Sequence, residues 1–326
     1  MLNDHAIILT ERRSKRDGEA MTERDARPIL VTGAGGQLGG YLLAVCRKRG
    51  LPVVGLGANS GPGVDVRADI ADKRAVDNAM AAIGPGVVIH GAAYTDVDGC
   101  ERDPTKADLV NHLGAANVAQ AARDAGAWVI AVGTDFVFSG THGEPYTERS
   151  NPDPISVYGT SKLAGERAVL DSDSTFAVAR TAWVYGGAGK HFPRTVLTMV
   201  RDRGSMTVVD DEVSCPTYAG DLADALAALV EKRPAGILHV TNEGSVSRYE
   251  FAKAVVDAAG GDPGSIRPTT TEEFLSRYPL PARRPQNSSL ANNRAAQLGV
   301  RLPGWRDAVD RYTPTLASEI GWLNGG

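Results

Sequence analysis

Residues 28–39 read Pro-Ile-Leu-Val-Thr-Gly-Ala-Gly-Gly-Gln-Leu-Gly, a short apolar run followed at once by a glycine-rich turn. Residues 41–49 then show a helical pattern. A strand, a glycine turn and a helix in this order form the dinucleotide-binding unit of a doubly wound α/β sheet. Small residues let the backbone approach a pyrophosphate, and the amino terminus of the helix offers free N–H groups. A tight turn without a ligand is the alternative explanation.

We predict that this turn binds the pyrophosphate of NAD(P). The residues assigned to this contact are Gly33, Gly36, Gln37, Leu38 and Gly39. The glycines follow Gly-x-x-Gly-x-x-Gly, and the commoner Gly-x-Gly-x-x-Gly is excluded because Leu38 occupies its third glycine position. A P-loop is also excluded, because no Gly-Lys-Ser/Thr follows.

The second predicted strand, residues 52–56, leads to a loop at 57–60 that would lie beside the adenosine ribose. An acidic residue in this loop favours NAD, whereas an arginine favours the 2′-phosphate of NADP. The loop reads Gly-Ala-Asn-Ser and carries neither. The missing carboxylate favours NADPH, with NADH as the alternative. Asp69 and Ile70 are assigned to the adenine edge, although a helix cap explains Asp69 equally well.

Two later apolar runs, residues 86–90 and 128–132, are predicted to be further parallel strands. In open α/β sheets, ligands bind at the carboxyl ends of the strands. Small residues after the first run would let a flat ligand lie against the backbone. The residues assigned to this part of the cofactor groove are Ala92, Ala93 and Tyr94.

The sequence Tyr-Gly-Thr-Ser-Lys at residues 158–162 places a tyrosine and a lysine on the same face of a predicted helix. The ordinary pKa of tyrosine is about 10, and a nearby cation lowers it. We therefore expect Lys162 to lower the pKa of Tyr158, which would donate a proton in carbonyl chemistry. Thr134, upstream at a strand end, would donate a hydrogen bond to the same carbonyl oxygen. These three residues are the predicted catalytic residues.

From residue 191 onward the alternation of strands and helices weakens, which predicts a smaller lobe. We expect an extension at residues 1–27, a Rossmann domain at 28–190 that later strands may complete, and a mainly substrate-binding lobe at 191–326. The residues assigned to the substrate are Thr134, Asp135, Trp183, Thr217 and Arg284. Trp183 could equally seal the core. Arg284 could bind a phosphate or lie in a solvated loop.

The formal net charge of -4, with mixed signs, argues against a nucleic-acid-binding surface. Three widely spaced cysteines suggest neither a disulfide framework nor a zinc site, and no metal ligand is assigned. No apolar run approaches the ~18 residues of a membrane span, and residues 1–27 do not read as a signal peptide. We expect a cytoplasmic protein whose extension is poorly ordered, with Met21 as an alternative start.

The glycine turn, the strand-end threonine and the Tyr-x-x-x-Lys helix together resemble the extended short-chain dehydrogenase/reductase family. Within that family, the sequence is similar to the dTDP-4-dehydrorhamnose reductases from about Ile29 to about Trp305. The stretches that carry this similarity are residues 33–39, 92–98, 134–138, 158–166 and 180–185, with Asp210-Asp211, Pro216-Thr217 and Arg-Pro-Gln-Asn-Ser at 284–288.

This resemblance implies a Rossmann-like doubly wound parallel sheet with a smaller carboxyl-terminal lobe. It also implies reduction of the C4 keto group of dTDP-4-dehydro-β-L-rhamnose to dTDP-β-L-rhamnose, the last step of dTDP-rhamnose synthesis. In this reaction Tyr158 supplies the proton, Thr134 orients the oxygen, and Lys162 holds the nicotinamide ribose. The alternatives are another sugar-nucleotide reductase or epimerase of the same fold, or a non-catalytic NADP-binding regulatory subunit. Both a monomer and a homodimer remain open.

The sequence departs from this family pattern at several positions and keeps the threonine, tyrosine and lysine. The family usually has Ser, Tyr and Asp at the positions of Gly133, Phe136 and Ser139, and Gln and Gly near Glu212 and Ser214. Because of these differences, the details of the family's substrate contacts are not carried over to this chain. The metal-linked dimer of some relatives is not carried over either.

Overall fold

The computed structural model describes residues 27–322 of the chain. The predicted extension, including the alternative start at Met21, lies outside the described residues except for Arg27. The guanidinium of Arg27 donates hydrogen bonds to the carbonyl oxygens of Ala125 (3.1 Å) and Gly126 (2.7 Å). Arg27, just before the first strand, is therefore hydrogen-bonded to the carboxyl end of the helix Gly114–Asp124.

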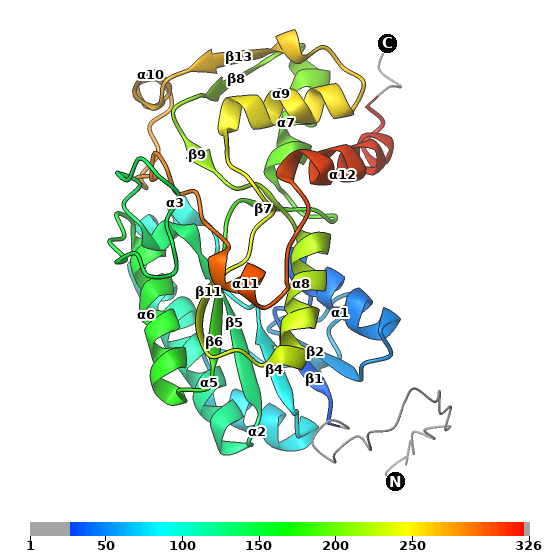
Figure 1. The fold of residues 1–326 in the computed structure, drawn as a ribbon, viewed down its shortest axis with the longest axis vertical. Coiled ribbons are helices and arrows are strands. Elements are labelled where there is room, and N and C mark those ends of the chain that lie inside the picture. Colours follow the sequence, from blue (N-terminus) through cyan, green and yellow to red (C-terminus); the bar gives the residue numbers. More distant parts are fainter. Residues whose placement is uncertain (1–26, 323–326) are drawn as a thin grey trace.

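A seven-stranded parallel sheet forms the centre of the larger lobe, with the strand order β11-β6-β5-β4-β1-β2-β3 (Figure 1). Its strands are β1 (Ile29–Thr32), β2 (Val53–Gly57), β3 (Val66–Arg67), β4 (Val87–His90), β5 (Trp128–Thr134), β6 (Ala177–Thr181) and β11 (Gly236–His239). The strand order reverses between β1 and β4, which opens a crevice at their carboxyl ends. The predicted Rossmann-like fold class is confirmed, and the last strand of the sheet comes from beyond residue 191.

Helices cover both faces of this sheet, which explains why β1, β4 and β6 are buried along their whole length. On one face α1 (Gln37–Lys48) packs against α8 (Ala219–Lys232). On the other face α2 (Lys73–Ile83), α5 (Gly114–Asp124) and α6 (Val157–Ser172) pack side by side. The short α3 (Val97–Arg102) lies against α6, and α11 (Asn293–Gln297) lies against β11.

The helical segment that begins at Pro104 and ends near residue 125 is interrupted in the structure. It consists of α4 (Pro104–Ala107), a π-helical segment (Asp108–Leu113) and α5. Pro104 stands in the first turn, where its missing N–H costs nothing. The π-helical turn accommodates an extra residue, a feature that is frequent at functional sites. It turns the buried side chain of Asn111 toward the loop after β4.

The smaller lobe stands above the carboxyl edge of the sheet and has its own core. That core is built from α7 (Phe192–Arg203), α9 (Arg248–Ala258) and α12 (Trp305–Glu319) with the parallel pair β8 (Met206–Val209) and β13 (Ile266–Thr269). Shorter elements are β7 (Val184–Tyr185) with β10 (Thr217–Tyr218), β9 (Val213–Ser214) with β12 (Val246–Ser247), and α10 (Thr271–Arg277). The two-residue strands were missed in the sequence because they are too short to show a periodic pattern.

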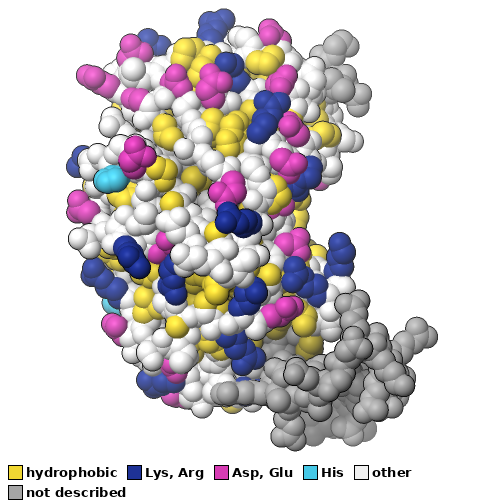
Figure 2. All heavy atoms as spheres, viewed as in Figure 1, with side chains coloured by type: hydrophobic (Ala, Val, Ile, Leu, Met, Phe, Trp, Pro, Cys, Tyr) yellow, Lys and Arg dark blue, Asp and Glu magenta, His cyan; other side chains and the backbone are white. Residues whose placement is uncertain are grey.

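Charged residues of both signs are interspersed over the face shown in Figure 2. Within residues 27–322, no helix combines the length and the apolar character needed to span a membrane. The same residues contain no cluster of three or more His, Cys, Asp or Glu side chains arranged to hold a metal ion.

A buried ion pair joins α6 to β6. The carboxylate of Glu166 accepts hydrogen bonds from Arg180 at 2.9 and 3.0 Å, and the two side chains are only 4% and 1% exposed. Gly133 of β5 lies directly against them, because a Cβ at this position would stand 2.5 Å from a carboxylate oxygen of Glu166. The departure from serine at position 133 therefore leaves room for the ion pair.

Removing one partner of this pair should destabilise the fold strongly. An Arg180→Met variant leaves the Glu166 carboxylate buried without its counter-ion, and we expect the free energy of unfolding in urea to fall by about 3–5 kcal/mol. A Glu166→Leu/Arg180→Met double variant should recover most of this loss, because an apolar pair leaves no buried charge. If the double variant is no more stable than the single one, the cost does not come from an unpaired carboxylate.

Candidate active site

The glycine turn between β1 and α1 forms one end of a cavity between the two lobes. Gly33 has a φ of +73°, and a Cβ on it would lie 2.8 Å from the backbone nitrogen of Ala92, in the loop after β4. Gly36 is the N-cap of α1 and brings no side chain to cap the helix. The N–H groups of the first helical turn are therefore left for a ligand. The turn fits a pyrophosphate, because it offers donors without a side chain in the way.

The cavity has a volume of about 1290 Å³. A site for one drug-sized ligand is typically about 300–1,000 Å³, so this cavity suits a dinucleotide with a second ligand beside it. It brings together every residue that the sequence assigned to the cofactor: Gly33, Gly36, Gln37, Leu38, Gly39, Asp69, Ile70, Ala92, Ala93, Tyr94, Tyr158 and Lys162.

Two hydrogen-bonded clusters hold the loop after β4 in place. Thr32 Oγ1 lies 2.8 Å from His90 Nδ1 and accepts a hydrogen bond from the backbone N–H of Ala92. Asn111 accepts from the backbone N–H of Tyr94 and donates both to the carbonyl of Tyr94 and to Ser161 of α6.

The His90 ring is electrically neutral. Burial lowers its pKa to about 3, and the charge of Lys162 acts in the same direction. Thr32 and His90 were not singled out in the sequence, because apolar neighbours make them part of ordinary strands.

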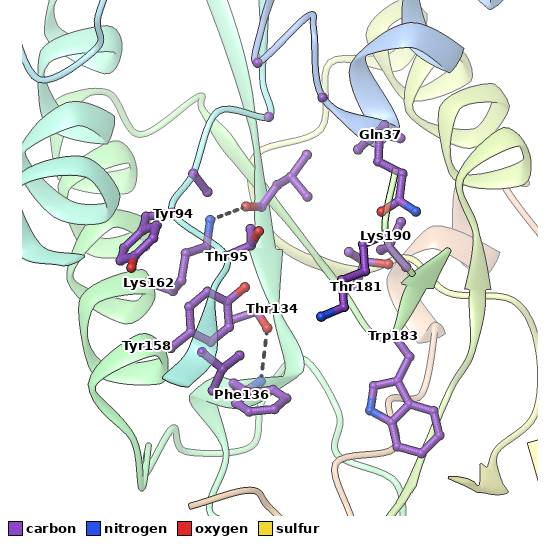
Figure 3. Close-up of a pocket in the computed structure, with 18 of the residues that line it drawn as sticks. Gln37, Tyr94, Thr95, Thr134, Phe136, Tyr158, Lys162, Thr181, Trp183 and Lys190 are labelled. Atoms are coloured by element: carbon purple, nitrogen blue, oxygen red, sulfur yellow. Dashed lines mark hydrogen bonds between the residues drawn. The ribbon is translucent and has the colours of Figure 1, made fainter. Parts of the chain in front are cut away.

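Thr134 ends β5, and Tyr158 and Lys162 lie on the first two turns of α6. Figure 3 shows the phenol of Tyr158 beside the Thr134 side chain at the cavity wall. Ser156 caps α6 by accepting a hydrogen bond from the backbone N–H of Gly159. The ring of Phe136, where relatives usually have tyrosine, packs edge-on against Tyr158 at 5.5 Å between centroids.

The expectation that Lys162 lowers the pKa of Tyr158 is wrong for this structure. Burial raises the pKa of the Tyr158 phenol, the neighbouring Thr134 acts in the opposite direction, and the charge of Asp135 raises it further. Lys162 Nζ donates a 2.8 Å hydrogen bond to the carbonyl oxygen of Val132. Its own pKa is lowered by burial, which the carboxylate of Glu166 partly counteracts. The phenol therefore stays protonated at neutral pH, the form that a proton donor needs.

Asp135 follows Thr134 at the cavity wall but is almost completely buried. Its carboxylate accepts hydrogen bonds from Ser214, Ser288 and the Thr134 hydroxyl, and the residue is 2% exposed. Burial raises its pKa to about 6, while these hydrogen bonds oppose the rise. One of these donors, the Ser214 hydroxyl on β9, stands near a position where relatives usually have glycine.

Trp183 lines the cavity from the smaller lobe and has a left-handed backbone, with a φ of +42°. Such a backbone in a bulky residue stores strain, and strained residues cluster at ligand sites. The Arg248 guanidinium lies 4.0 Å from the centre of the Trp183 ring and is paired with Glu212 at 3.0 Å. Trp183 also packs on the core of the smaller lobe, so it both seals that core and faces the cavity.

The two remaining substrate assignments differ in their placement. Thr217 is fully buried in β10, where its hydroxyl donates to the carbonyl of Cys215, and the structure does not bring it to the cavity wall. Arg284 lines the cavity but is bound to Asp98 of α3 at 2.6 Å. Its guanidinium therefore ties the late loop to α3 instead of standing free for a phosphate.

Several cavity residues were missed in the sequence. Arg248 belongs to the smaller lobe, where no motif marked it, and Glu212 was noted only as a departure from the family pattern. Lys190 follows the loop Gly186-Gly187-Ala188-Gly189. A glycine-rich loop just after a strand that ends in Tyr185 was a signal that could have identified Lys190.

The comparisons with known proteins cover almost the whole described chain. A family model described as RmlD substrate binding domain matches residues 27–318. The spore coat polysaccharide biosynthesis protein SpsK of Bacillus subtilis is 37% identical over 89% of this chain and 98% of its own length. The dTDP-4-dehydrorhamnose reductase of Streptomyces griseus is 40% identical over 90% of this chain and 95% of its own.

A solved structure shows the same arrangement in space. It is the crystal structure of dTDP-4-dehydrorhamnose reductase from Bacillus anthracis str. Ames in complex with NADP. It superposes with a TM-score of 0.81 and 33% identity, covering 88% of this chain and 98% of its own.

The buried carboxyl of Asp135 should leave a signature in the pH dependence of stability. Its pKa is about 6 in the folded protein and 3.8 ordinarily, so the folded state binds this proton more tightly and unfolding releases it. As pH falls from 8 to 4, the wild type should therefore gain up to roughly 3 kcal/mol relative to an Asp135→Asn variant. Urea unfolding of both proteins at several pH values measures this difference.

Comparing the two proteins removes the contributions of the histidines, which titrate in both. A difference that does not change between pH 8 and pH 4 would show that the Asp135 carboxyl is ionised throughout this range.

Proposed function

Because this chain belongs to the dTDP-4-dehydrorhamnose reductase family, within the extended short-chain dehydrogenases/reductases, we propose that it reduces dTDP-4-dehydro-β-L-rhamnose to dTDP-β-L-rhamnose. The reaction converts the C4 keto group into a hydroxyl and needs a hydride and a proton. The observation that supports it best is the pairing of a protonated Tyr158 with Thr134 at the cavity wall, beside the glycine turn. NADPH supplies the hydride when it is bound.

Tyr158 is the proton donor in this proposal. As negative charge develops on the C4 oxygen, the phenol O–H bond breaks and a new O–H bond forms on the sugar. Thr134 donates a hydrogen bond to the same oxygen and so holds it against the phenol. The Thr134 hydroxyl donates to Asp135 at 3.2 Å, and it would turn toward the substrate oxygen on binding.

Lys162 would hold the nicotinamide ribose. Its ammonium already lies at the cavity wall, bound to the carbonyl of Val132, and it comes from the turn of α6 that follows Tyr158. The glycine turn would hold the pyrophosphate, and the smaller lobe, through Trp183, would hold the sugar.

We propose a cytoplasmic protein, which agrees with its three free, buried cysteines. We also propose that it is a monomer or a homodimer.

We propose NADPH as the preferred cofactor. Asn59 and Ser60 follow β2 at the cavity wall, and neither would repel a 2′-phosphate. An acidic residue in this loop is what NAD-binding sites commonly use.

A non-catalytic regulatory subunit is the rival function. Such a protein would not require a buried tyrosine that stays protonated beside a hydrogen-bond donor, and this chain keeps both. An epimerase of the same fold is a further rival, and it would leave the total amount of NADPH unchanged.

Loss of the phenol should abolish most of the activity. We expect a Tyr158→Phe variant to reduce dTDP-4-dehydro-β-L-rhamnose at least ~100-fold more slowly, because a general acid contributes about 10²–10⁴-fold. NADPH oxidation measures the rate, and NADPH fluorescence checks that cofactor binding is kept. A Tyr249→Phe variant, whose hydroxyl lies on α9 outside the cavity lining, is the matched control. Turnover that survives in the Tyr158→Phe variant would exclude Tyr158 as the proton donor.

A carboxylate introduced after β2 should change the cofactor preference. We expect an Asn59→Asp variant to raise the KM for NADPH about tenfold, since a penalty of about 1.4 kcal/mol gives this factor, and to leave the KM for NADH unchanged or lower. Steady-state kinetics with both cofactors measures the ratio. An Asn59→Gln variant keeps the loop neutral and should behave as the wild type. If Asn59→Asp changed the KM for NADPH and the KM for NADH equally, the 2′-phosphate of NADPH would not lie beside Asn59.

A further inference from the structure

Five cationic side chains line the cavity, and four of them already have a partner. The engaged groups are Lys106 over the Tyr94 ring (4.5 Å), Lys162 on the carbonyl of Val132 (2.8 Å), Arg248 on Glu212 (3.0 Å) and Arg284 on Asp98 (2.6 Å). The fifth is Lys190, which is exposed and, within residues 27–322, has no hydrogen bond or ion pair. Among the described residues, Lys190 is therefore the cavity cation that no other side chain or carbonyl already engages.

Lys190 points into the cavity. Figure 3 shows its ammonium on the side of Thr181 and Trp183, directed across the cavity toward Thr134 and Tyr158. A ligand that presents its reacting carbon to Tyr158 and extends toward the smaller lobe would therefore pass Lys190.

The loop that carries Lys190 is anchored on both lobes. The backbone N–H of Gly187 donates to the hydroxyl of Tyr41 on α1 (3.1 Å), and the carbonyl of Gly187 accepts from the hydroxyl of Tyr312 on α12 (3.4 Å). After Lys190, His191 caps α7 by accepting a hydrogen bond from the backbone N–H of Arg194. The backbone of Lys190 thus lies between two anchored points, which keeps the residue beside the cavity.

The two ligands of the proposed reaction bring two diphosphates into one cavity. The diphosphate of the dinucleotide has the N–H groups at the start of α1. The diphosphate of the nucleotide sugar needs a separate cation, and Arg284 is neutralised by Asp98. Lysine is a common phosphate ligand because its ammonium is a compact charge with three donors.

We propose that Lys190 binds the diphosphate of the nucleotide-sugar substrate, an inference that rests on the proposed function. Its charge would set the affinity for the nucleoside diphosphate part of the substrate and leave the proton donor unaffected. The sugar would then lie between Lys190 and Tyr158.

Binding of substrate fragments tests this inference without the reaction. We expect a Lys190→Met variant to bind dTDP about tenfold or more weakly by titration calorimetry, because a hydrogen bond to a charged group is lost. Binding of thymidine, which has no phosphate, and of NADPH should not change. A Lys190→Arg variant should keep most of the dTDP affinity. A Lys48→Met variant, altered at the far end of α1, is the matched control and should bind as the wild type.

Kinetics separates this inference from the proposed function. If the wild type reduces dTDP-4-dehydro-β-L-rhamnose and Lys190→Met raises the KM for this substrate at constant kcat, both the proposed function and the role of Lys190 hold. If the wild type does not turn over but Lys190→Met still weakens dTDP binding, only the reaction is wrong. Unchanged dTDP binding in Lys190→Met, or a loss confined to NADPH, would overturn the role of Lys190. So would a wild type that binds no dTDP.

Discussion

The buried ion pair between Glu166 and Arg180 fixes helix α6 on the sheet, and the site depends on that placement. Two charges that are almost completely withdrawn from water are costly, and only close, well-directed hydrogen bonds offset the cost. Gly133 leaves the space that this geometry needs. Because Glu166 follows Lys162 by one helical turn, the same contact sets Lys162 against the carbonyl of Val132 and Tyr158 beside Thr134.

Burial, more than any neighbouring charge, decides the protonation of this site. It raises the pKa of Tyr158 and of Asp135 and lowers that of Lys162 and of His90. Each shift favours the uncharged form, as expected where water is excluded. A phenol held in its protonated form suits the reductive direction, in which the substrate oxygen must receive a proton.

The cavity joins two lobes with different tasks. The sheet edge provides small residues and helix N–H groups for a dinucleotide, whereas the smaller lobe provides a strained Trp183 braced by Arg248. Several contacts link the lobes directly, including the hydrogen bonds of Gly187 to Tyr41 and Tyr312. Of the five cavity cations, Arg248 and Arg284 are paired with carboxylates and Lys106 and Lys162 have uncharged partners, which leaves Lys190 unengaged among the described residues.

The sequence by itself determined the features that depend on neighbouring residues. The glycine turn, the strand-end Thr134 and the Tyr158–Lys162 spacing are local patterns, and a local pattern shows its period or its turn chemistry within a few residues. The fold class followed from their order, and the cofactor residues that they marked all meet at one cavity.

Only the tertiary structure decided what those side chains touch. Asp135 is bound to Ser288, 153 positions away, and Arg284 to Asp98, 186 positions away, so neither could be recognised as engaged from the sequence. The interruption of the helix around Asn111 and the raised pKa of Tyr158 likewise arise from packing by distant segments. The physical reason is that burial and hydrogen-bond partners are properties of the folded surface, which sequence spacing does not encode.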